Sequence, residues 1–230
     1  MMSDSKKLRE TRKKVIINET SKKDEKLIKI AIDDVIQVLI DNYPNIDFKW
    51  EKSINLSKIV DDLNVKYPNT DFKNLFQSSS LKPDGGIIYI NTLKGYLPIL
   101  IGEMKNQGTN KKRIEEGLKK QAKGNAIERL AKNVRGFEMM MISEDIFPFI
   151  CFGAGCDFEE TSTILDRVVT VSLFTELNKV RVKKIDLGNQ KLSVGSYFFR
   201  EGFWTVDEMK EKLLEVCKQS ISYYKEKGLV

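Results

Sequence analysis

Two acidic residues and one lysine near the middle of the sequence have the types and the spacing that a cation and phosphate site requires. Asp84 precedes two glycines and, after a hydrophobic stretch, Glu103 and Lys105 flank Met104. Side chains alternate between the two faces of a strand, so Glu103 and Lys105 would share one face while Met104 enters the core. Carboxylate oxygens are ligands for a hard cation, and an ammonium group attracts phosphate. The three side chains therefore predict a site where a metal ion meets a phosphate.

A hydrophobic hairpin would bring these side chains together. Residues 87–90 and 96–101 are rich in Ile, Leu and Tyr, and a turn that contains glycine separates them. This is the pattern of two antiparallel strands. The start of the first strand then lies beside the end of the second, so Asp84 meets the acid and the lysine there. Pro98 has no amide hydrogen for the strand ladder, and we expect it at an edge or a bulge.

The rest of the hydrophobic pattern predicts a single α/β domain over residues 1–230, with a mixed sheet flanked by helices. Helical spacing of apolar residues predicts helices over residues 24–42, from Asn55, from Gly124 and from Thr205, and a helical turn packed on the core at Phe72, Leu75 and Phe76. Further buried strands are predicted at residues 146–152 and 167–174, with alternatives at 180–185 and 196–200. Residues 1–23 are basic and form either an arm along nucleic acid or a solvated terminus.

The amino-acid composition excludes several classes of catalytic and metal site. The 230 residues contain no histidine, which excludes Ser-His-Asp and Cys-His catalysis and His-ligated zinc. The 39 Lys and Arg outnumber the 33 Asp and Glu, and the net charge of +6 favours a polyanionic partner. The three cysteines lack metal-binding spacing, and no apolar run has the length of a signal peptide or a membrane span. We therefore expect a cytoplasmic protein without membrane association.

A polar block at the start of the helix predicted from Gly124 supplies a second candidate site. Asn125 stands at an N-cap and Glu128 at the third helical position, which has the form of a capping box. Arg129 follows Asn125 by one helical turn and lies near the same face. Asn suits the N6/N7 edge of adenine and Arg suits purine acceptors, so a helix directed into a major groove would present both. Helix capping and base recognition are compatible uses of this block.

Three blocks of the sequence, taken together, resemble the EcoRI-like type II restriction endonucleases. They are Lys82-Pro83-Asp84-Gly85-Gly86-Ile87, Glu103-Met104-Lys105-Asn106-Gln107-Gly108 and Gly124-Asn125-Ala126-Ile127-Glu128-Arg129. Alone, Pro-Asp followed by Glu-x-Lys occurs by chance, and such a Lys-Glu pair is commonly a surface ion pair. The glycine-rich block and the Gly-Asn block in the same order make the resemblance specific. It continues through Lys132-Asn133 to Phe147-Pro148-Phe149.

The resemblance implies the PD-(D/E)xK nuclease fold, with a catalytic and recognition core at about residues 81–158. Asp84, Glu103 and Lys105 would be the catalytic residues. Asp84, Glu103 and the main-chain carbonyl of Met104 would bind Mg²⁺, and Lys105 would hold and polarise the attacking water. Mg²⁺ suits this role because it takes oxygen ligands, keeps several waters and lowers the pKa of a bound water.

The resemblance also implies how DNA would be read. Asn125, Ala126 and Arg129 would contact bases, and Gln107 is a further candidate. A homodimer would read one half-site of palindromic double-stranded DNA with each subunit. A central AATT, 5′-phosphate ends, 5′ overhangs and a companion DNA methyltransferase are expected. The outer base pair does not carry over, because the segment between Lys105 and Gly124 is shorter than in the family.

A run of basic residues would contact the DNA backbone without reading sequence. Its members are Lys111, Lys112, Arg113, Lys119, Lys120 and Lys123. The alternative for this run is an exposed helix in which Glu115 and Glu116 pair with the lysines. Two other functions also fit the sequence. One is a structure-selective nuclease of DNA repair or recombination, and the other is a basic nucleic-acid-binding protein without catalysis.

Overall fold

The centre of the protein is a mixed sheet of five strands. We describe it from a computed structural model, which covers residues 15–107, 115, 117 and 125–230. The strands lie in the order β1-β4-β5-β6-β9, where β1, β4 and β5 are antiparallel neighbours and β5, β6 and β9 run parallel. Their bounds are β1 Phe48–Glu51, β4 Gly86–Thr92, β5 Gly95–Asn106, β6 Phe149–Ala154 and β9 Ser196–Arg200. The predicted α/β class is confirmed.

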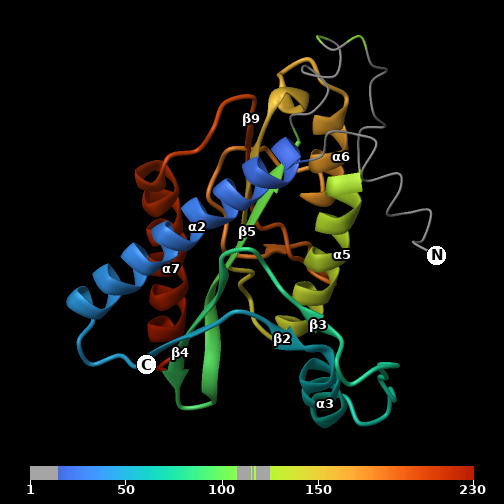
Figure 1. Cartoon of the computed structure of the whole chain (residues 1–230). Helices are drawn as coiled ribbons and strands as arrows, with labels where there is room; N and C mark the ends of the chain where they lie inside the picture. Colours follow the sequence, from blue (N-terminus) through green and yellow to red (C-terminus); the bar gives the residue numbers. More distant parts are fainter. Residues whose placement is uncertain (1–14, 108–114, 116, 118–124) are drawn as a thin grey trace, which may run out of the picture.

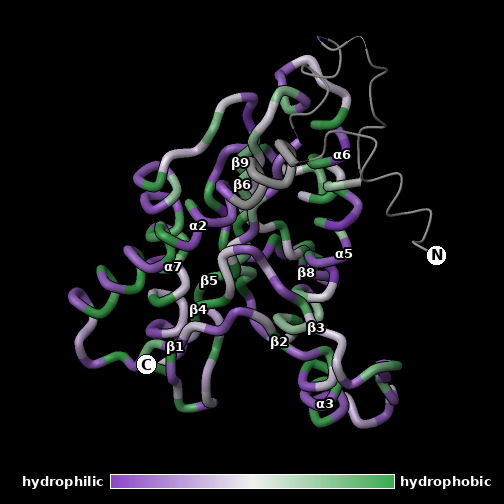
Figure 2. The backbone as a smooth tube through the Cα atoms, in the orientation of Figure 1, coloured by the Kyte–Doolittle hydropathy of each residue, from purple (hydrophilic) through white to green (hydrophobic). Residues whose placement is uncertain are grey.

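Helices cover both faces of this sheet (Figure 1). On one side α2 (Val15–Asn42) and α7 (Val206–Glu226) pack against each other and against β5. On the other side lie α5 (Asn125–Met140) and α6 (Ile164–Val171). In Figure 2 the central strands are hydrophobic along most of their length, whereas the helices alternate between hydrophobic and hydrophilic residues, as one buried face requires. Among the described residues, no helix combines the length and apolar character that a bilayer crossing needs.

The predicted hairpin is formed by β4 and β5, and it contains the predicted irregularity at Pro98. Ile88 pairs with Leu100 but the next residue, Tyr89, pairs with Pro98, so Ile99 is an extra residue in the ladder. Such a bulge accommodates a residue that has no amide hydrogen to donate. The Pro98 carbonyl accepts a hydrogen bond of 3.1 Å from the Tyr224 hydroxyl of α7. This prediction is confirmed.

The C-terminal helix begins where its sequence predicts. The Thr205 side chain accepts a hydrogen bond from the Glu208 amide, and the Glu208 carboxylate accepts one from the Thr205 amide. This capping box satisfies two main-chain donors at the helix start. The helix buries Met209, Leu213 and Cys217 against the sheet as predicted.

The strand predicted at residues 167–174 is wrong, because residues 164–171 form helix α6. The run of β-branched residues there favours a strand locally. However, β6 and β9 are parallel neighbours and need a crossover connection between them. Within that connection Ile164 and Val168, four residues apart, are buried on one helical face. The alternative at 196–200 is confirmed as β9, whereas that at 180–185 contributes only Ile185 to a short strand.

The helical turn predicted at Phe72, Leu75 and Phe76 is also wrong. This segment is irregular, with Leu75 93% and Phe76 67% exposed, so neither packs on the core. Only Phe72 packs against the core, and the Asn64 side chain bonds both its amide (2.8 Å) and its carbonyl (3.0 Å). Asn64 thereby takes the place of helical hydrogen bonds. The segment follows α3 (Leu56–Lys66), the short helix predicted from Asn55.

Two predicted boundaries shift. Helix α2 begins at Val15, so it extends into the predicted arm of residues 1–23, and residues 1–14 lie outside the described part. The strand predicted at 146–152 begins at Phe149, and Ile146 forms an isolated bridge with Lys183 instead. Four short strands form two separate pairs in the described part of the chain: β2 Ile54–Asn55 pairs with β3 Ser80–Leu81, and β7 Ile185–Asp186 pairs with β8 Lys191–Leu192.

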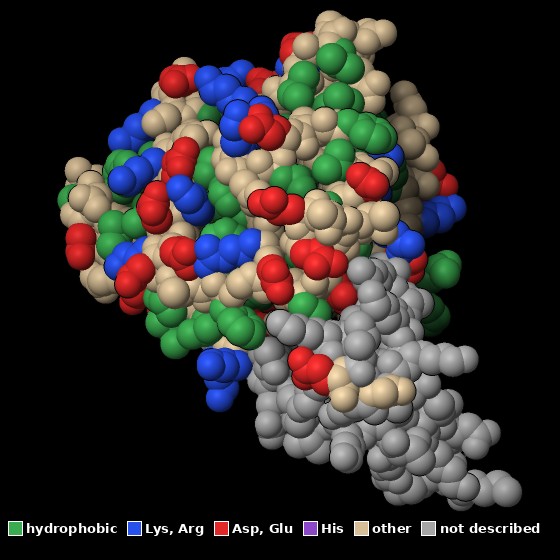
Figure 3. Space-filling model, turned by 90° about the horizontal axis from the view of Figure 1, so that it is seen from above, with side chains coloured by type: hydrophobic (Ala, Val, Ile, Leu, Met, Phe, Trp, Pro, Cys, Tyr) green, Lys and Arg blue, Asp and Glu red, His purple; other side chains and the backbone are tan. Residues whose placement is uncertain are grey.

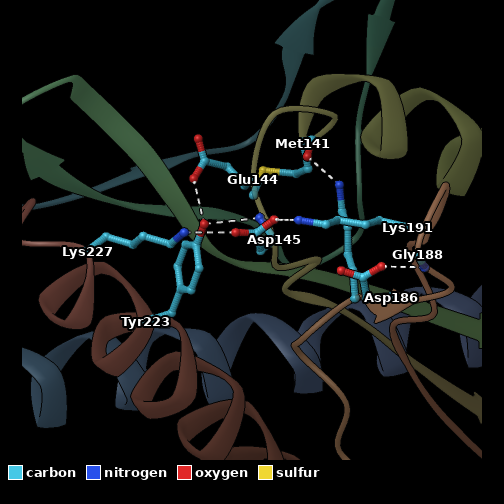
Figure 4. A network of polar contacts seen from close by, with 9 residues as sticks. Met141, Glu144, Asp145, Asp186, Gly188, Lys191, Tyr223 and Lys227 are labelled. Carbon is cyan, nitrogen blue, oxygen red and sulfur yellow. Dashed lines mark hydrogen bonds and ion pairs between the residues drawn. The ribbon is translucent and has the colours of Figure 1, made fainter.

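A polar cluster around Asp145 fastens the connection between α5 and β6 to the C-terminal helix (Figure 4). Lys227 donates to one carboxylate oxygen of Asp145 at 2.9 Å, and Lys191 donates to the other. The Asp145 amide donates to the Tyr223 hydroxyl at 3.0 Å, and that hydroxyl donates to Glu144 at 3.2 Å. These hydrogen bonds from the two lysines lower the pKa of Asp145 to about 2. Three segments distant in sequence are thus held together by one carboxylate.

Candidate active site

The turn that carries Asp84 is fixed beside the end of β5. The Gly85 amide donates to the Gly102 carbonyl at 2.9 Å, and the Gly86 amide donates to the Pro83 carbonyl at 3.0 Å. Gly86 then opens β4 opposite Gly102 in the antiparallel register. Asp84 therefore lies in the turn itself, beside the part of β5 that contains Glu103.

Gly85 and Gly86 are each required in this turn, for different physical reasons. Gly86 has φ +79°, a conformation that L side chains rarely adopt, and a Cβ there would come within 2.4 Å of the Trp50 indole nitrogen. A Cβ on Gly85 would lie 3.2 Å from both the Gly102 carbonyl oxygen and the end of the Ile28 side chain. The Gly-Gly pair after Asp84 is thus required by a left-handed backbone at one position and close packing against β5 and α2 at the other.

Alternation along β5 directs the charged side chains to one face of the sheet. Asn106 donates from its side chain to Asp24 of α2, and a Cβ on Gly102 would contact Ile32 of α2. Glu103 and Lys105, at the odd positions between them, consequently point to the opposite face, on which α5 lies (Figure 1). The helix predicted to read bases and the residues predicted to cut therefore share one face of the sheet.

The three predicted catalytic residues meet in the structure. The Lys105 ammonium donates to an Asp84 carboxylate oxygen at 3.3 Å, to the Met104 carbonyl at 3.1 Å and to a Glu103 carboxylate oxygen. The Met104 amide donates to the same Asp84 oxygen at 3.3 Å. Met104 itself is buried, as the strand pattern predicts. The ammonium thus lies among the three oxygens that the family resemblance predicts as metal ligands.

Burial and the neighbouring charges change the pKa values of Glu103 and Lys105. Glu103 is 1% exposed, and burial raises the pKa of its carboxyl group to about 7 against the opposing effect of the Lys105 charge. Burial alone would lower the pKa of Lys105, but the charges of Glu103 and Asp84 outweigh it and raise that pKa. Lys105 is accordingly protonated at neutral pH.

The oxygens of this cluster fit a magnesium ion. The second carboxylate oxygen of Glu103 is buried and has no hydrogen-bond partner in the described part of the chain. A buried carboxylate oxygen without a partner is costly unless a cation or a donor meets it. Among the described residues no group of three or more Asp, Glu, Cys or His could hold a metal alone. Two carboxylates, a main-chain carbonyl and waters form the sparse oxygen set that Mg²⁺ accepts.

Two residues beside the site were missed by sequence reasoning. The Trp50 indole N–H donates to the Gly85 carbonyl at 3.0 Å, and Asp24, 3% exposed, accepts from the Asn106 side chain. Burial raises the pKa of Asp24. Both residues come from elements far from Asp84 in sequence, so no local spacing connects them to it. An acid at the start of an otherwise apolar helical stripe was the one available signal for Asp24.

The predicted base-reading residues are placed only in part. Helix α5 begins at Asn125, and the Asn125 side chain lies outside what the structure describes. Ala126 is half-buried, whereas Arg129 is exposed on the first turn of the helix. Gln107 directly follows β5, where its amide donates to the Ala154 carbonyl at 2.9 Å. The side-chain carbonyl of Gln107 is buried and has no hydrogen-bond partner among the described residues.

The basic run predicted to contact phosphates falls in the part of the chain that the structure does not describe. Lys111, Lys112, Arg113, Lys119, Lys120 and Lys123 lie outside the described residues. On the face seen from the top of Figure 1, the described Lys and Arg side chains are interspersed with Asp and Glu (Figure 3). A cavity of about 530 Å³ lies elsewhere, between residues 180–194 and α7, and Asp84, Glu103 and Lys105 do not line it.

Comparison with known proteins identifies the family. The sequence matches a family model described as restriction endonuclease EcoRI over residues 11–164, more than half of the chain. It is 29% identical over 223 residues to the type II restriction enzyme RsrI of Cereibacter sphaeroides, a match that covers 81% of this chain and 79% of RsrI. It is 33% identical over 133 residues to the type II restriction enzyme EcoRI of Escherichia coli, covering 54% of this chain and 48% of that protein. The chain therefore belongs to the EcoRI family of type II restriction endonucleases.

Proposed function

We propose that this protein is a Mg²⁺-dependent endonuclease that hydrolyses both strands of a palindromic DNA site with a central AATT. The products would carry 5′-phosphates and 5′ overhangs. The observation that carries the proposal is the convergence of Asp84 and Glu103 on the Lys105 ammonium, beside a second Glu103 carboxylate oxygen that is buried and has no hydrogen-bond partner among the described residues. Membership of the EcoRI family supplies the reaction class.

The proposed chemistry assigns a separate task to each group. Asp84, Glu103 and the Met104 carbonyl would hold Mg²⁺, which offsets charge on the phosphate and lowers the pKa of a bound water. The charges of Glu103 and Asp84 raise the pKa of Lys105, which favours its ammonium form. Lys105 would hold and polarise the attacking water beside the phosphate. The fixed hairpin positions these groups before DNA arrives, which favours an in-line displacement.

The proposed recognition uses the face that the site and α5 share. Asn125, Ala126 and Arg129 at the start of α5, with Gln107 at the end of β5, would contact base edges. Basic residues 111–123 would contact phosphates and add affinity without sequence preference. A homodimer would place two such sites across a palindrome in double-stranded DNA. We further propose that the protein acts in the cytoplasm of a prokaryotic cell, where a companion methyltransferase protects the genome.

Digestion of a plasmid of known sequence tests this function. Purified protein with Mg²⁺ is expected to give discrete fragments, and sequencing of their ends is expected to locate AATT-centred palindromes. Cleavage confined to branched or flapped DNA would instead indicate a structure-selective nuclease. Binding without cleavage, indifferent to Mg²⁺, would indicate a non-catalytic DNA-binding protein.

Replacing Lys105 tests the site itself. Lys105→Ala is expected to lower the single-turnover cleavage rate by about 10²–10³-fold, since it removes a donor that acts on developing charge. Affinity for the cognate site, measured with Ca²⁺ in place of Mg²⁺, should remain close to that of the parent protein. Lys94→Ala is the matched control, because Lys94 is an exposed lysine at the opposite end of the same hairpin. Undiminished cleavage by Lys105→Ala would refute the assignment.

A further inference from the structure

We propose that Trp50 is a positioning residue for Asp84. Its indole N–H holds the turn of residues 83–86 in the conformation that keeps Asp84 beside Glu103 and Lys105. The inference rests on the proposed function, because it concerns the same site. It assigns a part in that site to β1, the strand at the edge of the sheet next to β4 (Figure 2).

The contact between Trp50 and the turn is direct. The indole nitrogen donates to the Gly85 carbonyl at 3.0 Å, and Gly85 directly follows Asp84. Two main-chain hydrogen bonds, from the Gly85 amide to Gly102 and from the Gly86 amide to Pro83, hold the same turn. The Trp50 bond fixes the carbonyl of the peptide unit whose amide belongs to Gly86. The three bonds together leave the backbone after Asp84 little freedom to rotate.

The hydrogen bonds of the Asp84 carboxylate are longer than the hydrogen bonds that hold the turn. Its hydrogen bonds to the Met104 amide and the Lys105 ammonium are both 3.3 Å long. Hydrogen bonds of N–H to oxygen are most common near 2.9–3.0 Å and weaken beyond about 3.2 Å. The main-chain bonds of the turn, at 2.9 and 3.0 Å, are shorter. The position of Asp84 is therefore set by the turn more than by the residues with which it would share a metal ion.

Trp50 is more exposed than a tryptophan that only packs on the core, but its indole N–H is well placed to hold the turn. It is 42% exposed, although Trp is a large apolar side chain whose burial is favourable. Its one polar atom is directed inward, to the turn. The indole also lies against Gly86, where a Cβ would come within 2.4 Å of the indole nitrogen and 2.7 Å of Cε2. Gly86 and Trp50 are thus a matched pair, because only glycine at position 86 lets the indole reach the Gly85 carbonyl.

The geometry of the sheet explains how a distant residue reaches the site. Trp50 is opposite Ile88 in the antiparallel pairing of β1 with β4. The strand β1 ends at Glu51, opposite Ile87 and one residue short of the start of β4 at Gly86, so Trp50 lies close to the turn that precedes β4. An outer residue that holds an inner ligand in place commonly changes metal affinity or activity by about 10–100-fold when it is replaced.

Trp50→Phe tests the proposal, because it removes the N–H while keeping an aromatic ring. Three quantities are compared with the parent protein: the amide hydrogen exchange of the 83–86 turn, the dissociation constant for Mn²⁺ by calorimetry, and kcat and KM on a cognate duplex. We expect faster exchange at Gly85 and Gly86, Mn²⁺ binding weakened about tenfold, and a similar fall in kcat with KM unchanged. Lys49→Ala on the same strand is the control, since it removes an exposed pair with Glu51 and leaves the indole in place.

The outcomes separate this inference from the proposed function. A Trp50→Phe protein with parental exchange at the turn, parental Mn²⁺ affinity and parental kcat would overturn the positioning role. An equal loss of Mn²⁺ affinity in Lys49→Ala would also overturn it, because the effect would then belong to the edge strand in general. If the parent protein neither binds Mn²⁺ nor cuts DNA, the proposed function fails. The exchange measurement would still show whether Trp50 holds the turn.

Discussion

At the scale of single residues, two of the residues proposed to read bases lie within the first turn of α5. Asn125 begins α5 and Arg129 is exposed one turn later, on the helix that lies on the same face of the sheet as Glu103 and Lys105. A side chain that reads a base edge contributes discrimination between sequences, whereas a lysine on a phosphate contributes affinity for any sequence. The two contributions can be separated by measuring both kinds of binding at one salt concentration.

Asn125→Ala should reduce discrimination and leave general affinity in place. The loss of a bidentate contact with adenine is worth about 1–3 kcal/mol, so the ratio of site to non-site affinity is expected to fall by about 5–150-fold. Competition binding with Ca²⁺ at fixed salt measures this ratio. Arg135→Ala, an exposed residue farther along α5 that pairs with Glu138, is the control and should keep the parental ratio. A uniform weakening on all sequences would contradict base recognition by Asn125.

At the scale of elements, the Asp145 cluster stabilises the junction of three segments in a pH-dependent way. Hydrogen bonds from Lys191 and Lys227 lower the pKa of Asp145 to about 2, below its unfolded value of about 3.9. A carboxyl group whose pKa is lower in the folded state contributes stability above its unfolded pKa. That contribution is lost as the pH falls from about 4 to about 2. Because Asp145 is 40% exposed, solvent limits it to about 0.5–1 kcal/mol.

Asp145→Asn is expected to lower the melting temperature by about 1–4 °C at pH 7. The difference from the parent protein should shrink as the pH falls from about 4 to about 2. Calorimetry across this range measures it. Asp186→Asn is the comparison, since Asp186 lies opposite Lys191 in the β7–β8 pair but its carboxylate accepts a hydrogen bond from the Gly188 main-chain amide (Figure 4). A destabilisation that persists unchanged at pH 2 would show that the charge of Asp145 is not its cause.

Elements whose secondary structure is determined by local sequence could be predicted, whereas elements determined by tertiary contacts could not. The β4–β5 hairpin follows from alternation and a turn, and α7 from a capping box, so both are evident in the sequence. The segment 164–171 is helical because it lies in a crossover between parallel strands, a fact about β9 that local propensity does not contain. Trp50 reaches the turn through strand pairing, and Phe72 is held by Asn64, so neither contact leaves a periodic signal.

At the scale of the whole molecule, the proposed function requires two copies. One chain presents one cluster of Asp84, Glu103 and Lys105, whereas a double-strand break in a palindrome needs two. Sedimentation equilibrium is expected to give twice the chain mass of 26.5 kDa, and titration should give one dimer per cognate duplex. A duplex that carries one half-site should bind far more weakly, because only one subunit can make base contacts. A monomer that cuts both strands at one site without pairing would contradict this.

The attachment of the last residues to the hairpin has a practical consequence. The Leu93 amide donates to the Leu229 carbonyl at 3.1 Å, which places the C-terminal end beside the β4–β5 turn, at the end of β5 remote from Glu103 (Figure 1). A fluorophore or a surface anchor joined after Val230 would therefore stand a strand's length from the reacting groups. Immobilised through this end, the protein would present Glu103 and Lys105, its proposed catalytic residues, toward duplex DNA in solution.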